Sequence, residues 1–226
     1  MMTSDVQAIY SPDNEPYLGS ESLLAFDLAI PRAMQVHAAI GPMTFSSQLS
    51  PLQRCATEII PQGISIALSI RELVRQAYLF SAAILMRPLV DRTGLMQYLV
   101  TYPLAIQAWH DGWPRKDQPT FDALFALVMP DATVQHREQI TNLMHKLVHT
   151  DPKSALFNMF RRADGSLAFA SGKVLTRPDS ADVIVDLAHH CLRRLTAMSA
   201  FVFDYQPENA QPMHQPGGVA SDNVPN

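Results

Sequence analysis

The sequence predicts a mainly α fold, an antiparallel helical bundle with one small β-hairpin before the last helix. Apolar residues recur at helical spacing along most of the chain, and short connections between these runs favour antiparallel neighbours. Only the stretch FNMFRRADGSLAFASGKV alternates as strands do. The chain has 226 residues, of which 47% are apolar, and this is enough for one domain with a sizeable core.

The domain is expected to span residues 20–205, and the composition changes on either side of it. Residues 1–19 are rich in Ser, Asp, Asn, Pro and Gly, which predicts a flexible N-terminal segment. Residues 206–226 carry four prolines, two glycines and almost no large apolar side chain. We expect a disordered tail there, because such a segment buries too little surface to offset its ordering entropy.

Serine residues mark the expected starts of the first two helices. Residues 21–39 are predicted to form one or two helices broken at Pro31, with Ser20 as the N-cap. Ser50 followed by Pro51 is a favourable helix start, since a capping hydroxyl precedes a proline at the first helical position.

Prolines and one glycine are expected to interrupt the next helices. Pro61 and Gly63 should break the helix that runs to about Gln76. The segment 77–100 is apolar on almost every side, which predicts a central helix that Pro88 kinks or divides.

The second half of the chain predicts shorter elements before one long helix. We expect helices at 102–113 and 121–129, a helix capped by Asp131 that ends near His149, a hairpin turning at Asp164-Gly165, and a last helix at 179–203.

Composition narrows the class of protein. The formal charge of −4 does not suggest a chain that binds nucleic acid over its whole surface, although a local basic patch stays possible. Cys55 and Cys191 lie far apart, which argues against a disulfide scaffold and fits a reducing compartment. The longest apolar run, 77–86, is short of the about 20 residues that span a bilayer. With no basic-plus-apolar leader, we expect a soluble cytoplasmic protein without membrane contact.

A charged pair lies within the most apolar helix. Arg87 and Asp91 are spaced i, i+4 and can meet on one helix face among Ile, Leu and Val residues. One interpretation is a structural ion pair between helices. The other is an anion site, because the guanidinium fork suits a phosphate. Arg71 and Arg75 form a second same-face pair one helix earlier.

The segment MHKLVHTDP places His145 and His149 one helical turn apart. A metal site is one interpretation, but Lys146 stands where the zinc-protease pattern requires Glu, and the sequence predicts neither metal nor other cofactor. A general acid–base role beside a phosphate is the second interpretation. The third is structural, since a histidine at a helix C-terminus interacts favourably with the helix dipole.

The order of features resembles a group of bacterial proteins. The run IRELVRQAYLFSAAILMRPLVDR, a Trp-containing short helix, NLMHKLVHTDP, a hairpin and a last helix resemble DUF5677-like uncharacterised proteins over roughly residues 50–203. RPLVD is similar to an Arg-Pro-Leu-hydrophobic-acid pattern of that group. The arrangement is also distantly similar to HEPN-type bundles, many of which are metal-independent ribonucleases in toxin and phage-defence systems.

The HEPN resemblance implies an Arg followed by a His on one helix, and the sequence departs from it. No arginine stands at the required spacing before His145 or His149. The chemistry therefore requires Arg87 or Arg71 to approach from a neighbouring helix.

Two functional hypotheses follow. The first is a HEPN-like, metal-independent ribonuclease or defence-associated protein with RNA as partner. Its candidate catalytic residues are His149, His145 and Arg87, and its candidate phosphate-binding residues are Asn142, Lys146 and Arg71. The second is a non-catalytic helical interaction module, which could be a homodimer because its helices carry more apolar surface than one bundle needs.

Overall fold

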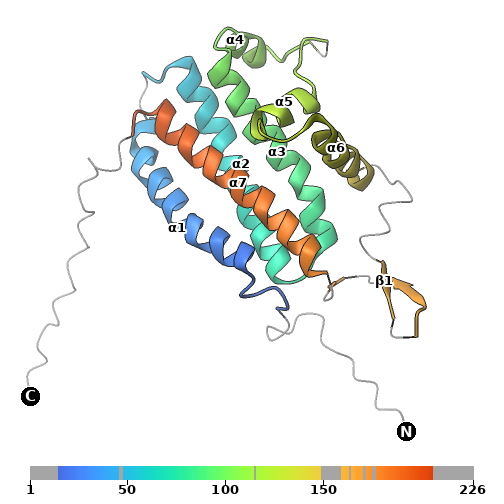
Figure 1. Cartoon of the computed structure of the whole chain (residues 1–226). Helices are drawn as coiled ribbons and strands as arrows, with labels where there is room; N and C mark the ends of the chain where they lie inside the picture. The colour runs from blue at the N-terminus through green and yellow to red at the C-terminus, as the bar shows by residue number, and fades with distance from the viewer. Residues whose placement is uncertain are drawn as a thin grey trace, which may run out of the picture.

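The computed structural model describes residues 15–45, 48–114, 116–148, 159–162, 164–169, 172–174 and 177–205, and within them the fold is mainly α, as predicted (Figure 1). The helices are α1 (Glu21–Ile40), α2 (Pro51–Arg75), α3 (Leu79–Thr101), α4 (Ala105–His110), α5 (Phe121–Val128), α6 (Val134–Val148) and α7 (Pro178–Val202), with the short 3₁₀ helix η1 (Gly41–Phe45) after α1. The predicted tail at 206–226 and His149 lie outside the described residues.

The four long helices make the main packing unit. α2 packs against both α3 and α7, α1 packs along α7, and Figure 1 shows these helices side by side. Their shared core is built from large side chains that are almost fully buried, among them Phe26, Ile70, Leu89, Leu192 and Leu195. α5 packs on α3, and α6 lies against α3 and α5 at the edge of this unit.

The prolines do not divide the helices, which contradicts the predicted interruptions at Pro31 and Pro61 and the predicted division at Pro88, whereas a kink at Pro88 stays a prediction. Pro31, Pro61 and Pro88 each lie inside an uninterrupted helix, α1, α2 and α3 respectively. A proline removes one backbone donor and strains one turn, and burial of the apolar face offsets that cost in helices of at least 20 residues.

The helix starts follow the predicted capping chemistry in two cases and depart from it in a third. The Ser20 hydroxyl accepts from the Leu23 backbone N–H, and Ser50 forms a reciprocal capping box with Gln53. Asp131 is not the cap of α6, because residues 129–133 turn first. The Thr133 hydroxyl accepts from the His136 N–H instead, so α6 starts at Val134.

Two short strands precede α7. β1 (Met159–Arg161) pairs antiparallel with β2 (Leu167–Phe169), and Gly165 between them has φ +81°. Residues 149–158, 163 and 170–171 lie outside the described residues, so the predicted hairpin as a whole stays a prediction.

Part of the segment expected to be flexible is packed. Tyr17 is buried, and its hydroxyl donates to the Val174 carbonyl and accepts from the Arg177 N–H. Glu15 forms an ion pair with Arg75. These contacts hold residues 15–19 against the ends of α2 and α7, whereas 1–14 lie outside the described residues.

Within the part of the chain that the structure describes, one helix is long and apolar enough to cross a membrane by length and composition. This span, Glu21–Phe45, covers α1 and η1, and 28% of its most apolar window is buried. This span contains no long uninterrupted apolar run, because polar residues lie within it, whereas its mean hydropathy over a window is high. Core helices and signal sequences pass the same test, so the cytoplasmic location stays a prediction.

Candidate functional site

The structure brings Arg87 of α3 and His145 of α6 into contact. The Arg87 Nη1 lies 2.9 Å from Nδ1 and 3.3 Å from Nε2 of the His145 ring. A guanidinium has only donors, so the ring nitrogen nearest to it must direct a lone pair at Arg87. Two residues 58 positions apart in the chain therefore share one hydrogen bond.

An aromatic ring and a carboxylate complete the surroundings of Arg87. The guanidinium carbon lies 4.7 Å from the centroid of the Phe121 ring, which also meets His145 edge-on at 6.3 Å. Asp91 Oδ2 lies 3.9 Å from Arg87 Nε, one turn along α3. The Arg87 side chain is 23% exposed, so solvent and small solutes reach it.

Asp91 is half-buried between positive groups. Desolvation raises the pKa of its carboxyl, and the charges of Arg87 and Arg92 act in the opposite direction without cancelling that effect. The carboxyl consequently keeps its proton to a higher pH than an exposed aspartate does.

A glycine lets α5 approach α3 closely enough to place Phe121 over Arg87. A Cβ atom at Gly94 would lie 2.7 Å from both the Cβ and the carbonyl oxygen of Leu124. Thr120 caps α5, because its hydroxyl accepts from the Ala123 N–H. The cap and the close contact fix the start of α5, where Phe121 lies.

The other predicted site residues are placed less favourably. Lys146 follows His145 on α6 and is half-buried, whereas Asn142 is exposed on the same helix. His149, predicted as the main proton carrier, lies outside the described residues. Of the predicted catalytic set, the structure therefore brings together Arg87 and His145.

Arg71 is engaged in a different contact. Its Nε and Nη2 atoms donate to the two carboxylate oxygens of Asp27 on α1, each at 2.7 Å, and a third nitrogen lies 3.4 Å from Glu72. This two-armed ion pair joins α1 to α2 and occupies the face that a phosphate would take. Arg75 likewise pairs with Glu72 and Glu15.

A polar cavity adjoins the Arg87 site through Asp91. Its volume is about 600 Å³, and it lies between α2, α3 and the stretch that runs from the end of α4 through the connecting loop into α5. Its walls combine aromatic, amide and charged groups: Glu58, Ile59, Gln62, Asp91, Arg92, Leu95, Trp109, Gly112, Trp113, Gln118, Pro119 and Leu124.

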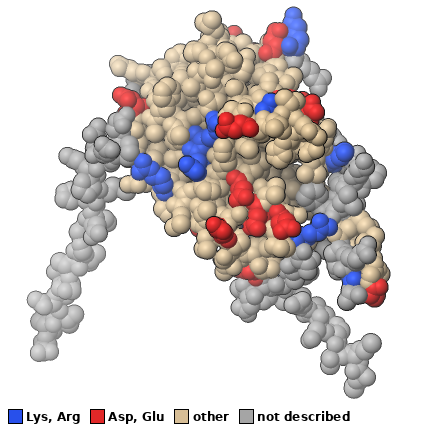
Figure 2. All heavy atoms as spheres, viewed as in Figure 1, with Lys and Arg blue, Asp and Glu red and all other residues tan. Residues whose placement is uncertain are grey.

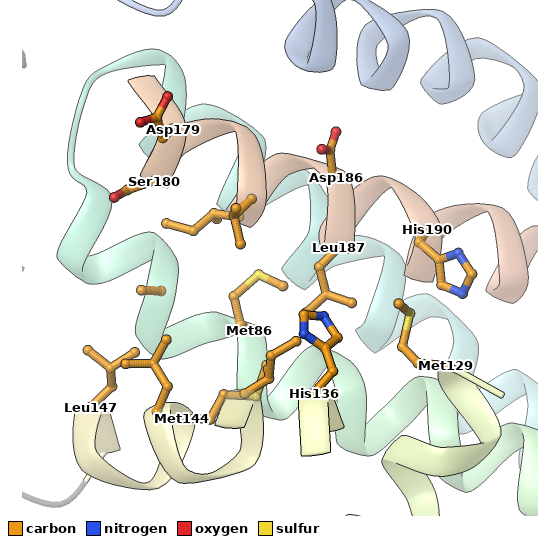
Figure 3. Close-up of a pocket in the computed structure, with 15 residues that line it drawn as sticks. Met86, Met129, His136, Met144, Leu147, Asp179, Ser180, Asp186, Leu187 and His190 are labelled. Atoms are coloured by element: carbon orange, nitrogen blue, oxygen red, sulfur yellow. The ribbon is translucent and has the colours of Figure 1, made fainter. Parts of the chain in front are cut away.

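A second cavity of about 610 Å³ lies between α3, α6 and α7, and its lining is mostly apolar. Figure 3 shows Met86 and Leu187 pointing into it from α3 and α7, with His136 beside them. Asp186 points away from it. No arginine or lysine is among its described lining residues, so the cavity does not present the guanidinium donors of the Arg87 site.

The charge distribution favours a local site over a broad binding surface. On the face shown in Figure 2, acidic and basic side chains occur in small groups separated by uncharged surface. Proteins that bind nucleic acid over a wide surface carry a basic stripe instead. On the face shown, recognition of an anion would therefore rest on individual basic side chains.

No group of three His, Cys, Asp or Glu side chains able to hold a metal ion is found within the described residues. Comparisons with protein-family models, curated proteins and solved structures found no match to this chain. The DUF5677-like and HEPN-like resemblances therefore stand on the quoted motifs, as proposals.

Sequence reasoning missed Phe121 and the polar cavity. The sequence marked Phe121 only as the start of a helix, and interpreted Trp109 and Trp113 as a packed helix edge. Both tryptophans do pack against the core, and Trp113 meets Tyr98 edge-on at 5.8 Å, yet each also lines the cavity. No periodicity signal predicts a cavity assembled from segments that lie far apart in the sequence.

Proposed function

We propose that this protein is a metal-independent ribonuclease of the HEPN-like kind, acting at the Arg87–His145 site. The observation that supports it is the hydrogen-bond contact between that guanidinium and that imidazole. The contact supplies from two helices the Arg and His pair that HEPN-type proteins carry on one helix. The proposal retains the predicted antiparallel bundle, the hairpin and a cytoplasmic location.

The residues suit cleavage of RNA by its own 2′-hydroxyl. The 2′ oxygen attacks the adjacent phosphorus, the P–O5′ bond breaks, and the products are a 2′,3′-cyclic phosphate and a free 5′-hydroxyl. A phosphate at Arg87 takes over the guanidinium donors, and this frees the His145 lone pair to accept the 2′-hydroxyl proton. Arg87 then stabilises the charge that develops on the phosphoryl oxygens.

The second proton carrier is assigned from sequence spacing. His149 follows His145 by four residues, and in this proposal it returns a proton to the 5′ oxygen. Lys146 and Asn142 complete the phosphate-binding set, and Arg71 is left out of it because Asp27 holds both arms of its guanidinium. Imidazoles and a guanidinium supply proton transfer and charge stabilisation, so the reaction requires no metal ion.

The test is cleavage of single-stranded RNA by the purified protein in EDTA. We expect cleavage that leaves a 2′,3′-cyclic phosphate. His145→Ala should lower the cleavage rate about 10²–10⁴-fold, and Arg87→Gln should lower it about 10²–10³-fold. His136→Ala is the matched control, because His136 is exposed on the same helix and lines the apolar cavity.

Each outcome decides the proposal. Absence of cleavage, or full activity in a folded His145→Ala variant, refutes it. Equal loss in His136→Ala and His145→Ala indicates a general effect on α6 and also contradicts it. Circular dichroism of every variant shows whether the fold is kept.

The alternative is a non-catalytic interaction module that forms a homodimer. The observation that favours it is the exposed apolar surface on the α1–α7 side. Leu28 and Leu24 of α1 are 80% and 51% exposed, and Phe201 at the end of α7 is 70% exposed. Leu28 and Ala200 line one hollow between these helices. Large exposed apolar side chains on two neighbouring helices are a feature of many protein interfaces.

Sedimentation analysis tests the alternative. The alternative is supported if the wild-type protein is a dimer, Leu28→Glu dissociates that dimer, and Leu104→Glu leaves the dimer intact. Leu104 is the matched control because it is 96% exposed and lies at the N-cap of α4, outside α1 and α7. A wild-type protein that sediments as a monomer at all concentrations refutes the homodimer.

A further inference from the structure

The polar cavity beside Asp91 has the composition of a site for a flat heteroaromatic ligand. Trp109 and Trp113 supply aromatic surface, and Ile59 and Leu95 add apolar wall. A volume of about 600 Å³ falls within the range of small-molecule sites. Base–aromatic stacking is the usual way in which proteins hold an unpaired nucleobase.

The polar groups of the cavity match the edge of a base. Gln62 and Gln118 each carry an amide, and Gln62 Oε1 accepts from Arg92 Nε at 3.1 Å. The Gln62 amide hydrogens remain available to donate to a base acceptor. Glu58 is exposed at the wall and presents a carboxylate that accepts from base amino or imino groups.

Charge decides which end of a nucleotide enters the cavity. Glu58 and Asp91 place two acidic groups in its wall against one arginine, Arg92. A phosphate would be repelled by the two carboxylates, whereas a neutral base would not. Arg87 lies just outside the cavity, 3.9 Å from the same Asp91 carboxylate. The phosphate end therefore belongs at Arg87 and the base belongs in the cavity.

We propose that this cavity is a nucleobase subsite, which holds one base of single-stranded RNA beside a phosphate bound at Arg87. The inference rests on the proposed function for the identity of its substrate, and it adds a specificity site that the cleavage chemistry does not itself require. Trp109 and Trp113 stack against the base, and Gln62 and Arg92 hydrogen-bond with its edge. Asp91 joins the two halves, because it lines the cavity and contacts Arg87.

The chain offers a direct probe of this subsite. It contains two tryptophans, and both line the cavity, so intrinsic tryptophan fluorescence reports on occupancy there. The full-length protein is titrated with the four ribonucleoside monophosphates, the matching nucleosides, ribose 5-phosphate and inorganic phosphate. Free tryptophanamide corrects for light absorbed by the bases.

We expect saturable quenching by at least one nucleoside and tighter binding of its monophosphate. Gln62→Ala should weaken the binding of both about fivefold, the effect of one lost hydrogen bond. Arg87→Gln should weaken the monophosphate alone, because its side chain lies outside the cavity. Gln107→Ala is the control: Gln107 is exposed on α4, bonds to Asp111 and does not line the cavity.

The outcomes separate this inference from the proposed function. Cleavage in EDTA without saturable quenching by any nucleoside overturns the subsite and leaves the ribonuclease. Quenching without cleavage overturns the ribonuclease and supports a nucleotide-binding site. Equal quenching by ribose 5-phosphate and by the nucleotides overturns the subsite, since no base would then be recognised.

Discussion

Replacing Gly94 with alanine tests whether the close packing of α5 on α3 is what organises the Arg87 site. The added methyl carbon would lie 2.7 Å from the Cβ and from the carbonyl oxygen of Leu124. Both atoms belong to the rigid part of α5, so no rotamer change relieves the overlap. The helix itself has to move by several tenths of an ångström. Phe121, three residues earlier on α5, would move with it, away from Arg87.

The magnitude follows from two opposing terms. Alanine is favoured over glycine inside a helix by about 1 kcal/mol. Overpacking a filled core costs about 1–3 kcal/mol, and a backbone contact belongs at the upper end of that range. We therefore expect Gly94→Ala to lower the free energy of unfolding by about 1–2 kcal/mol.

Gly63→Ala is a matched control within the same fold. Gly63 is also a buried helical glycine, and its added Cβ would lie 2.6 Å from Leu195 Cδ1. That atom is the end of a flexible side chain, which can rotate away. The gain in helix propensity then offsets most of the packing cost, so the expected change is within about 1 kcal/mol of zero.

Urea unfolding followed by circular dichroism measures both changes. The midpoints are compared at constant denaturant slope, because a changed slope signals loss of two-state behaviour. A Gly94→Ala protein as stable as the wild type would refute the close approach of α5. A Gly63→Ala loss larger than that of Gly94→Ala would refute the distinction between backbone and side-chain overlap.

Two further predictions concern ionisation. Hydrogen bonds from Arg75 lower the pKa of Glu72 to about 2 from the ordinary 4.5, so its contribution to stability is present above pH 4.5 and is lost as the pH falls towards 2. Glu72→Gln should flatten that part of the pH–stability curve; an unchanged acid limb contradicts the assignment. Burial raises the pKa of Cys55 to about 11 and that of Cys191 to about 12. A thiol reagent at neutral pH should therefore label both cysteines only after unfolding. Rapid labelling of either cysteine in the native protein, detected by mass spectrometry, would disprove this.

Local chemistry explains which parts of the fold were predictable. Ser20 and Ser50 were identified as N-caps because a cap depends on the hydroxyl and on the few backbone N–H groups that follow. The prolines misled the prediction, since their cost is local whereas the compensation is tertiary. Pro88, for example, lies between Leu89 and Met86, which are both buried in the core. Burial by other helices is not encoded in the segment itself.

In the candidate site, too, local features could be predicted from the sequence and contacts between distant segments could not. Arg87 was identifiable because a charge in an apolar helix requires a partner. Helical spacing suggested Asp91 at i+4 as its partner, and only the ribonuclease hypothesis placed the histidines beside it. The closer contact is His145, from a helix that begins more than 40 residues later. Periodicity gives the face of a helix but not the neighbour that covers it. Trp109 and Trp113 are a second example. Their spacing predicts a packed helix edge, and the cavity that they line forms only when other helices pack beside them.

A comparison of two arginines indicates where an anion binds. The Arg71 and Arg87 side chains are equally exposed, at 23% each. Asp27 neutralises Arg71 with two contacts of 2.7 Å. The ion pair of Arg87 is looser, at 3.9 Å. Its nearer partner is an imidazole nitrogen at 2.9 Å, and an aromatic ring centroid lies 4.7 Å from its guanidinium carbon. At equal exposure, the charge of Arg87 is compensated less, so an incoming phosphate gains more there.

Thermal unfolding in inorganic phosphate tests this difference. Phosphate at about ten times its Kd stabilises the folded state by about 1.4 kcal/mol, which raises Tm by about 3–6 °C for a domain of this size. Arg87→Gln should lose that rise, measured against chloride at equal ionic strength. Arg71→Gln should keep it, although its own Tm falls because Asp27 is left unpaired. Phosphate also stabilises proteins by exclusion from their surface, and that part is common to both variants. An equal phosphate response in the two variants would show that Arg87 is no better an anion site than Arg71, and that its contacts with His145 and Phe121 serve the packing of α3 alone.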